Sequence, residues 1–141
     1  MGQDIQVNIV VPNQTQYLSL IGGIGEKIAK EIDEYQGDRE ALAFNINLAL
    51  TEAMMNAIKH ANSDGSDDTV EVKIHIEEDE LCIRVYDQGQ GFDLDAVPAP
   101  DLDHPSEGGL GIFFIRSFMD VVRYETIEDG NNVLEMRKRL V

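Results

Sequence analysis

Apolar and polar side chains alternate strictly from Val70 to Ile76, with valine or isoleucine at every second position. This alternation is typical of a β-strand with one buried and one exposed face. A turn at Glu77 to Glu80 separates it from a second run of this kind, Leu81 to Val85. Residues 69–87 are therefore predicted to form a hairpin, and other parts of the chain must cover its apolar face.

The N-terminal third of the chain is predicted to supply one strand and two helices. Residues 4–11 alternate like the hairpin and are expected to form an edge strand that ends at Pro12. From Gln14 to about Tyr35, and again over residues 39–61, apolar residues recur at helical spacing, and Gly37-Asp38 separates the two stretches.

Three glycines inside the first predicted helix, Gly22, Gly23 and Gly25, resemble part of a phosphate-binding loop. No Gly-Lys-Ser/Thr follows them and no convincing strand precedes them, so a helix that is softened by glycine or closely packed is favoured. The acidic segment 62–68, NSDGSDD, lacks the ligand spacing and the closing glutamate of a calcium loop, and we expect a solvated turn there.

The C-terminal half begins with a long stretch without periodicity, residues 88–108, which holds three of the four prolines. A loop of this length in a compact domain is often a functional lid. Gly111 is then expected to open a helix, IFFIRSFMD, and two strands around Asp129-Gly130 to close the chain. The whole chain, residues 1–141, is predicted to be a single α/β domain.

The charge of the chain excludes several kinds of partner. The formal net charge is −16 and the sequence pI is about 4.3, so nucleic acid and anionic membranes would be repelled and basic proteins attracted. No apolar run approaches the roughly 18 residues of a membrane span, and the N-terminus does not read as a secretory signal. Cys82 is the only cysteine, which suits a cytoplasmic location and a role as a small sheet residue.

Three segments carry groups that could bind a ligand or take part in catalysis. Glu52, Asn56 and Lys59 follow one another along one face of the second predicted helix, where a carboxylate and a carboxamide can meet a metal ion and a lysine can meet a phosphate. A solvated polar edge of an amphipathic helix would explain the same three residues.

The other two segments are rich in glycine. YDQGQGF, residues 86–92, follows a strand, so that Asp87 could accept a hydrogen bond from an amine such as that of adenine. In EGGLGIFFIR, residues 107–116, Gly109 and Gly111 precede a helix whose free N–H groups could bind an anion, with Arg116 further along. Taken alone, the first of these segments is more often an ordinary turn than a nucleotide site, and the second is by default a helix start without a function.

The order of the three segments is specific, and with it the sequence resembles the GHKL (histidine kinase-like) ATPase superfamily. The residues that carry the resemblance are LALTEAMMNAIKHAN, VYDQGQGFD and GGLGIFFIRSFMD. Within the superfamily the chain looks most similar to the anti-sigma factor serine/threonine kinases of bacterial partner-switching systems. The resemblance implies an α/β sandwich (α+β), in which helices back a mixed, largely antiparallel sheet, and an ATP lid at about residues 88–108.

The resemblance also implies roles for individual residues. Glu52 would be the general base, Asn56 would ligate Mg²⁺, and Asp87 would bind the adenine amine of ATP. The remaining positions that it places at ATP are Lys59, Gly89, Gly91, Gly109, Leu110, Gly111 and Arg116.

Two positions depart from the family pattern. Glu107 and Gly108 stand where many relatives have a basic residue, and an acid there would oppose a γ-phosphate. Asn131-Asn132 follows Gly130 where relatives tend to have threonine near adenine, which puts that contact in doubt, although asparagine can donate or accept in its place.

The function implied is a kinase that phosphorylates an anti-anti-sigma (STAS-type) partner and sequesters a sigma factor. Glu107 leaves open an alternative, a module that binds ATP and captures partners without transferring phosphate. A detached ATP domain of a histidine kinase ranks third. Relatives often form dimers, and nothing in the sequence decides whether this chain forms a homodimer.

Overall fold

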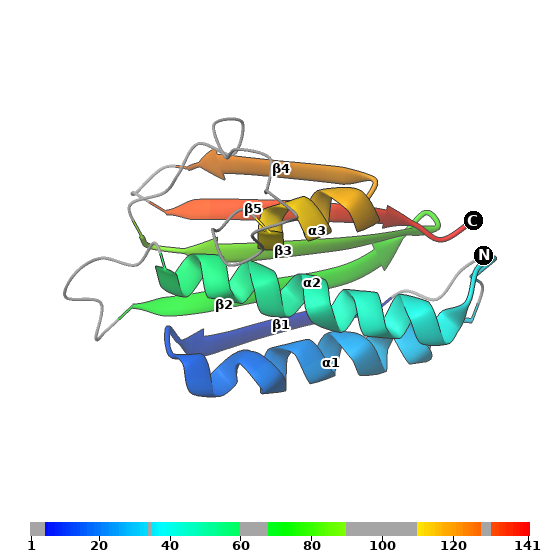
Figure 1. Ribbon diagram of the computed structural model, residues 1–141, viewed down its shortest axis with the longest axis horizontal. Helices are drawn as coiled ribbons and strands as arrows, with labels where there is room; N and C mark the ends of the chain where they lie inside the picture. The colour runs from blue at the N-terminus through cyan, green and yellow to red at the C-terminus, as the bar shows by residue number, and fades with distance from the viewer. Residues whose placement is uncertain (1–4, 34, 60–67, 90–109, 128–130) are drawn as a thin grey trace.

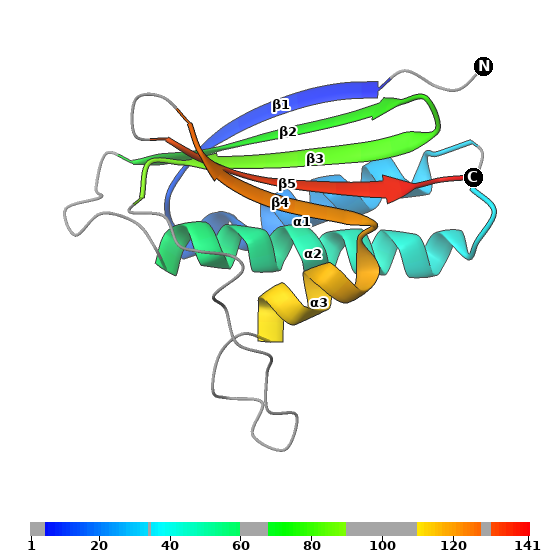
Figure 2. The ribbon, with the colours of Figure 1, turned by 90° about the horizontal axis from the view of Figure 1, so that it is seen from above.

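Helices cover one face of a single five-stranded sheet in the computed structural model, and the other face is left open by the described elements (Figure 1, Figure 2). The structure describes residues 5–33, 35–59, 68–89, 110–127 and 131–141. The expected α/β sandwich is therefore confirmed. None of the described helices combines the length and the apolarity that a membrane crossing requires.

The sheet has the strand order β1-β2-β3-β5-β4, and every described pairing is antiparallel. The largely antiparallel sheet is thus confirmed, as are the edge position of the first strand and the predicted hairpin. At the hairpin turn Glu78 and Asp79 have positive φ angles of 52° and 63°. The strands are β1 (Ile5–Pro12), β2 (Thr69–Glu77), β3 (Glu80–Asp87), β4 (Val121–Thr126) and β5 (Asn132–Arg139).

The helices are the 3₁₀ helix η1 (Thr15–Tyr17), α1 (Leu18–Lys30), α2 (Arg39–Lys59) and α3 (Leu110–Phe118). The first predicted helix was too long at both ends, because its start is a 3₁₀ turn and its last turn tightens where Glu31 donates to two successive carbonyls. The start of α2 is fixed by Asp38, whose Oδ1 accepts from the N–H groups of Glu40 at 3.0 Å and Ala41 at 3.3 Å. The third helix begins one residue earlier and ends sooner than predicted.

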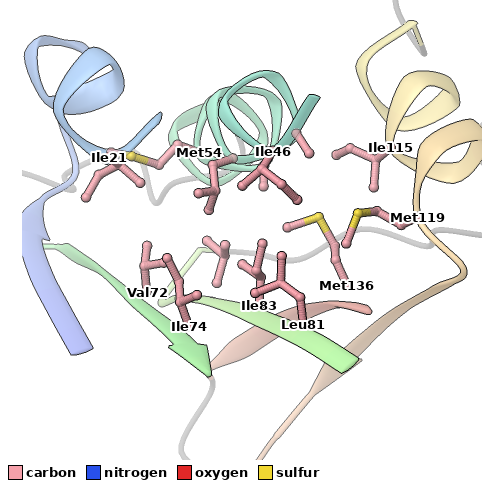
Figure 3. Packing of buried hydrophobic residues seen from close by; sticks show 14 of the residues in the cluster. Ile21, Ile46, Met54, Val72, Ile74, Leu81, Ile83, Ile115, Met119 and Met136 are labelled. Carbon is pink, nitrogen blue, oxygen red and sulfur yellow. The ribbon is translucent and has the colours of Figure 1, made fainter. Parts of the chain in front are cut away.

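The core lies between the sheet and the helices, as Figure 3 shows. Ile46 and Met54 of α2 face the apolar side chains of β2 and β3, while Ile115 of α3 lies near Met136 of β5. All four side chains are almost fully buried. The alternation read from the sequence therefore places its apolar set against the helices, and α2 runs over the middle of the sheet.

The glycines of α1 allow it to pack closely against α2. A β-carbon on Gly22 would lie 2.7 Å from Oγ1 of Thr51, and one on Gly25 would overlap the side chain of Leu50. By contrast, a β-carbon on Gly23 would meet nothing within 4 Å. The prediction of a closely packed helix instead of a phosphate loop is thus confirmed.

The open face of the sheet carries an ion-pair network across β3 and β5. Glu135 lies 2.9 Å from Nη2 of Arg84 and 3.0 Å from Nη2 of Arg137, and Arg137 also reaches Glu80 at 2.9 Å. Cys82 is buried beside this network, and burial raises the pKa of its thiol. Its predicted role as a small sheet residue is confirmed.

Candidate functional site

The first part of the candidate site is the C-terminal half of α2, which presents Glu52 and Asn56 one turn apart on the same side. Both residues are partly buried. The side-chain Nδ2 of Asn56 is buried and finds no hydrogen-bond partner among the described residues. A buried amide left without a partner costs about 1–3 kcal/mol. This position therefore favours an additional polar group next to Asn56, as a bound ligand would supply.

Glu52 meets the start of α3, which belongs to the second glycine segment. A β-carbon on Gly111 would overlap Oε2 of Glu52, so any larger residue at position 111 would have to displace the carboxylate. Gly111 is the second residue of α3, where backbone N–H groups lack partners within the helix. The carboxylate thus lies beside the positive end of a helix, and the first and third predicted segments are brought together.

Asp87 is the last residue of β3 and only 4 % exposed. Its Oδ1 accepts a hydrogen bond from the backbone N–H of Gly89 at 2.8 Å. It also accepts one from Nδ2 of Asn132 at 3.0 Å. The carboxylate is therefore held in a fixed orientation at the end of the strand.

Asn132 was not among the predicted site residues, although the sequence marked its position as a departure from the family pattern. It is 1 % exposed, and besides Asp87 its Nδ2 donates to the carbonyl oxygen of Gly89 at 2.8 Å. Thr126 donates to its Oδ1 at 3.0 Å. The pairing of Asp87 with Asn132 between β3 and β5 creates these contacts. The local sequence around either residue does not show them, and the available signal was the family pattern that places this position near adenine.

The elements that carry these groups are arranged in a consistent way. Figure 1 and Figure 2 both show the end of β3, which carries Asp87, at the same end as the last turns of α2. The start of α3 contacts α2 at Glu52. The described structure thus offers a buried acceptor at the end of β3, and a carboxylate and an amide on α2, whose Glu52 meets the start of α3. Such a set suits a ligand with a polar ring at one end and anionic groups at the other.

Several predicted residues are not placed at a ligand by the described contacts. Lys59 lies in the last turn of α2 and Arg116 in the last turn of α3, and both side chains are exposed. Leu110 begins α3. Gly91 and Gly109, together with most of the predicted lid and Glu107, lie outside the described residues.

The described part of the chain contains no group of three or more His, Cys, Asp or Glu side chains that could hold a metal ion.

The chain was compared with protein-family models and with known proteins, and the matches agree with one another. Residues 23–138 match the family model described as a histidine kinase-like ATPase domain. The chain is similar to the serine-protein kinase RsbW of Halalkalibacterium halodurans, with 32% identity over 95% of this chain and 83% of that protein. It is also similar to RsbW of Bacillus subtilis, with 28% identity over 84% and 77% of the two chains.

Solved structures are similar in fold. The catalytic domain of the histidine kinase ThkA superposes with a TM-score of 0.57 at 12% identity, over 96% of this chain and 97% of that one. The blue-light activated histidine kinase EL346 of Erythrobacter litoralis gives 0.53 at 22% identity, over 89% and 41%. At these identities the likeness concerns the fold alone.

Proposed function

Because the chain belongs to the histidine kinase-like ATPase family, we propose that it is an ATP-dependent serine/threonine kinase that phosphorylates a partner protein. The observation that carries the proposal is the close approach of Glu52 to Gly111. It joins a carboxylate that can act as a base to a helix start that can bind phosphate. The name serine-protein kinase, borne by relatives that align with most of this chain, supports the same reaction.

Glu52 serves as the general base of this reaction. Its carboxylate accepts the proton of a serine or threonine hydroxyl of the partner, and the hydroxyl oxygen forms a bond to the γ-phosphorus of ATP. The bond between that phosphorus and the oxygen bridging it to the β-phosphate breaks, and ADP leaves with the electron pair. Catalysis then consists mainly of positioning and of stabilising charge, for which the N-terminus of α3 is suited.

The residues present fit a magnesium ion that is bound together with the nucleotide. The side-chain oxygen of Asn56 is a ligand type that Mg²⁺ accepts, while its buried, unpartnered Nδ2 is a donor that suits a phosphate oxygen. When bound, Mg²⁺ would neutralise part of the charge on the phosphates. Asn56 would hold it, and Asp87 would bind the adenine at the other end of ATP.

The partners of this kinase are, in this proposal, a STAS-type anti-anti-sigma protein as phosphate acceptor and a sigma factor that is sequestered. The resemblance to partner-switching kinases supports both, and a net charge of −16 favours basic partners over nucleic acid. We place the reaction in the cytoplasm, in a single domain of residues 1–141 whose lid spans about residues 88–108.

The experiment that tests this function incubates the purified chain with ATP, Mg²⁺ and a candidate STAS protein. Glu52→Gln should lower phosphorylation of the partner by about 10²- to 10⁴-fold and leave nucleotide binding in place. Glu40→Gln is the matched control, because it removes the same charge from an exposed position in the first turn of the same helix.

Two outcomes would contradict the kinase proposal. Phosphorylation of the partner that survives Glu52→Gln would remove the base from the mechanism. Partner binding that depends on nucleotide, without any phosphoserine or phosphothreonine on the partner, would instead support the module that captures partners without transfer.

A further inference from the structure

We infer that Asn132 is a positioning residue of the adenine pocket, whose amide fixes Asp87 so that the site accepts adenine and rejects guanine. The inference rests on the proposed function, since it assumes that ATP binds at Asp87. It adds a residue that the described structure joins to the site from the far end of the chain. Asn132 acts through Asp87 and Gly89 and is not itself assigned a contact with the nucleotide.

The hydrogen bonds of Asn132 leave its side chain a single orientation. Its Nδ2 donates both to Oδ1 of Asp87 at 3.0 Å and to the carbonyl oxygen of Gly89 at 2.8 Å. Its Oδ1 accepts from Oγ1 of Thr126 at 3.0 Å. Turning the amide over would place its oxygen against two acceptors, which is unfavourable, so the network itself determines which end faces Asp87.

This orientation determines which oxygen of Asp87 we expect to accept a hydrogen bond from the ligand. Both hydrogen bonds that Gly89 and Asn132 donate to the carboxylate end on Oδ1, which fixes its plane. We assign the other oxygen, Oδ2, to the exocyclic amine of adenine. A buried carboxylate oxygen accepts such an amine and repels the carbonyl oxygen that guanine carries at the same position of the ring.

Asn132 also ties together two parts of the pocket that are distant in sequence. Asp87 and Gly89 belong to the first glycine segment, whereas Asn132 begins β5, whose neighbour β4 contains Thr126. With Asn132 and Asp87 only 1 % and 4 % exposed, water cannot readily replace these bonds. Removing the amide donor would therefore loosen both the carboxylate and the backbone of Gly89.

The test compares Asn132→Asp with Asn131→Asp by titration calorimetry with Mg-ATP and Mg-GTP. Asn132→Asp keeps the size of the side chain but replaces the donor by a second acceptor that faces Asp87. Asn131→Asp introduces the same charge at the adjacent residue, whose backbone carbonyl accepts a hydrogen bond from the N–H of Ile127 at 2.7 Å. Asn132→Ser serves as a second variant should Asn132→Asp fail to fold.

We expect Asn132→Asp to weaken Mg-ATP binding by about tenfold or more, the effect of one charge-assisted hydrogen bond. The ratio of ATP affinity to GTP affinity should fall by a similar factor, while Asn131→Asp keeps both values within about twofold. In the kinase assay, KM for ATP should rise with little change in kcat, because the substituted group acts at the adenine end of ATP and not at the reacting phosphorus.

An unchanged ATP-to-GTP ratio in Asn132→Asp, or in Asn132→Ser, would overturn the inference. If Asn132 had a purely structural role, its substitution would lower the stability of the fold and weaken the binding of both nucleotides by the same factor. Failure of the proposed function can be distinguished from failure of this inference, because it would appear in the wild-type protein as an absence of ATP binding.

Discussion

Gly111 packs so closely against Glu52 that a β-carbon at position 111 would overlap the carboxylate oxygen Oε2. The start of α3 and the middle of α2 are therefore in contact at the point where the proposed base and the proposed phosphate site meet. Glycine is common at the start of a helix, so its presence at position 111 does not by itself predict this contact. Here its function is to leave room for a carboxylate.

Gly111→Ala should destabilise the fold by less than about 1 kcal/mol, because the new methyl group and Oε2 of Glu52 compete for one space but the flexible carboxylate can move aside. Adding Glu52→Ala should relieve the overlap, so that the double variant loses less stability than the two single variants together. Urea unfolding of the four proteins measures this coupling. Strictly additive free energies of unfolding would show that the two residues do not touch.

The glycines of α1 give a second test of packing. Gly25→Ala should lower the free energy of unfolding by about 1–3 kcal/mol, because its methyl group would overlap Leu50 in the contact between α1 and α2. Gly23→Ala in the same helix is the control. It should be neutral or stabilising by about 0.5–1 kcal/mol, since alanine favours the helix and nothing lies within 4 Å of the new carbon. Equal effects of the two substitutions would contradict the packing described.

The ion-pair network on the open face makes part of the stability depend on pH. Burial raises the pKa of Glu135, but hydrogen bonds from Arg137 and Arg84 outweigh it, and the net pKa lies below its ordinary value. A carboxyl group with a depressed pKa in the folded state stabilises the protein at pH values above its unfolded pKa. That contribution is lost as the pH falls through the lowered folded value.

Glu135→Gln should therefore cost about 1 kcal/mol near neutral pH, since the partly exposed arginines are screened by solvent. The difference from wild type should shrink as the pH is lowered from about 6 toward about 3. Urea unfolding across this range provides the measurement. Glu125→Gln, at an exposed position on β4, should show little difference at any pH. A Glu135 effect that is constant with pH would rule out the charge as its source.

The net charge of −16 leads to a prediction about partner binding. Association with a basic partner should weaken at least several-fold when the ionic strength rises from about 0.05 M to about 0.3 M, because salt screens the attraction. Surface plasmon resonance at several salt concentrations would show this mainly as a slower association rate. An affinity that stays constant over the range would mean that the interface does not rely on charge.

The elements that could be predicted from the sequence are those whose own apolar residues follow a regular spacing along the chain. Strict alternation in β2 and helical spacing in α2 placed these elements correctly, because each buries one face against the same core. The break at Gly37-Asp38 marked the start of α2 in the sequence, and in the structure Asp38 caps this helix. The start and the end of α1 were misjudged, since the pattern of apolar residues runs on into the 3₁₀ turn before the helix and to Ile32 after it.

What could not be predicted depends on residues that meet only in the folded sheet. Asn132 joins Asp87 because β5 lies between β3 and β4, and nothing in the spacing of the two residues reveals that order. The network of Glu135 with Arg84 arises in the same way. The proximity of Glu52 to Gly111 was implied by the family resemblance and not by the local pattern of either segment.

The central claim is that α2, the end of β3 and the start of α3 together form one site for Mg-ATP. Titration calorimetry with Mg-ATP on wild type, Asp87→Asn and Asn56→Ala tests it most directly. We predict one nucleotide per chain for the wild type and affinities at least about tenfold weaker for both variants, since each loses a polar contact to the ligand. Absence of binding to the wild type, or binding that neither substitution alters, would contradict the account.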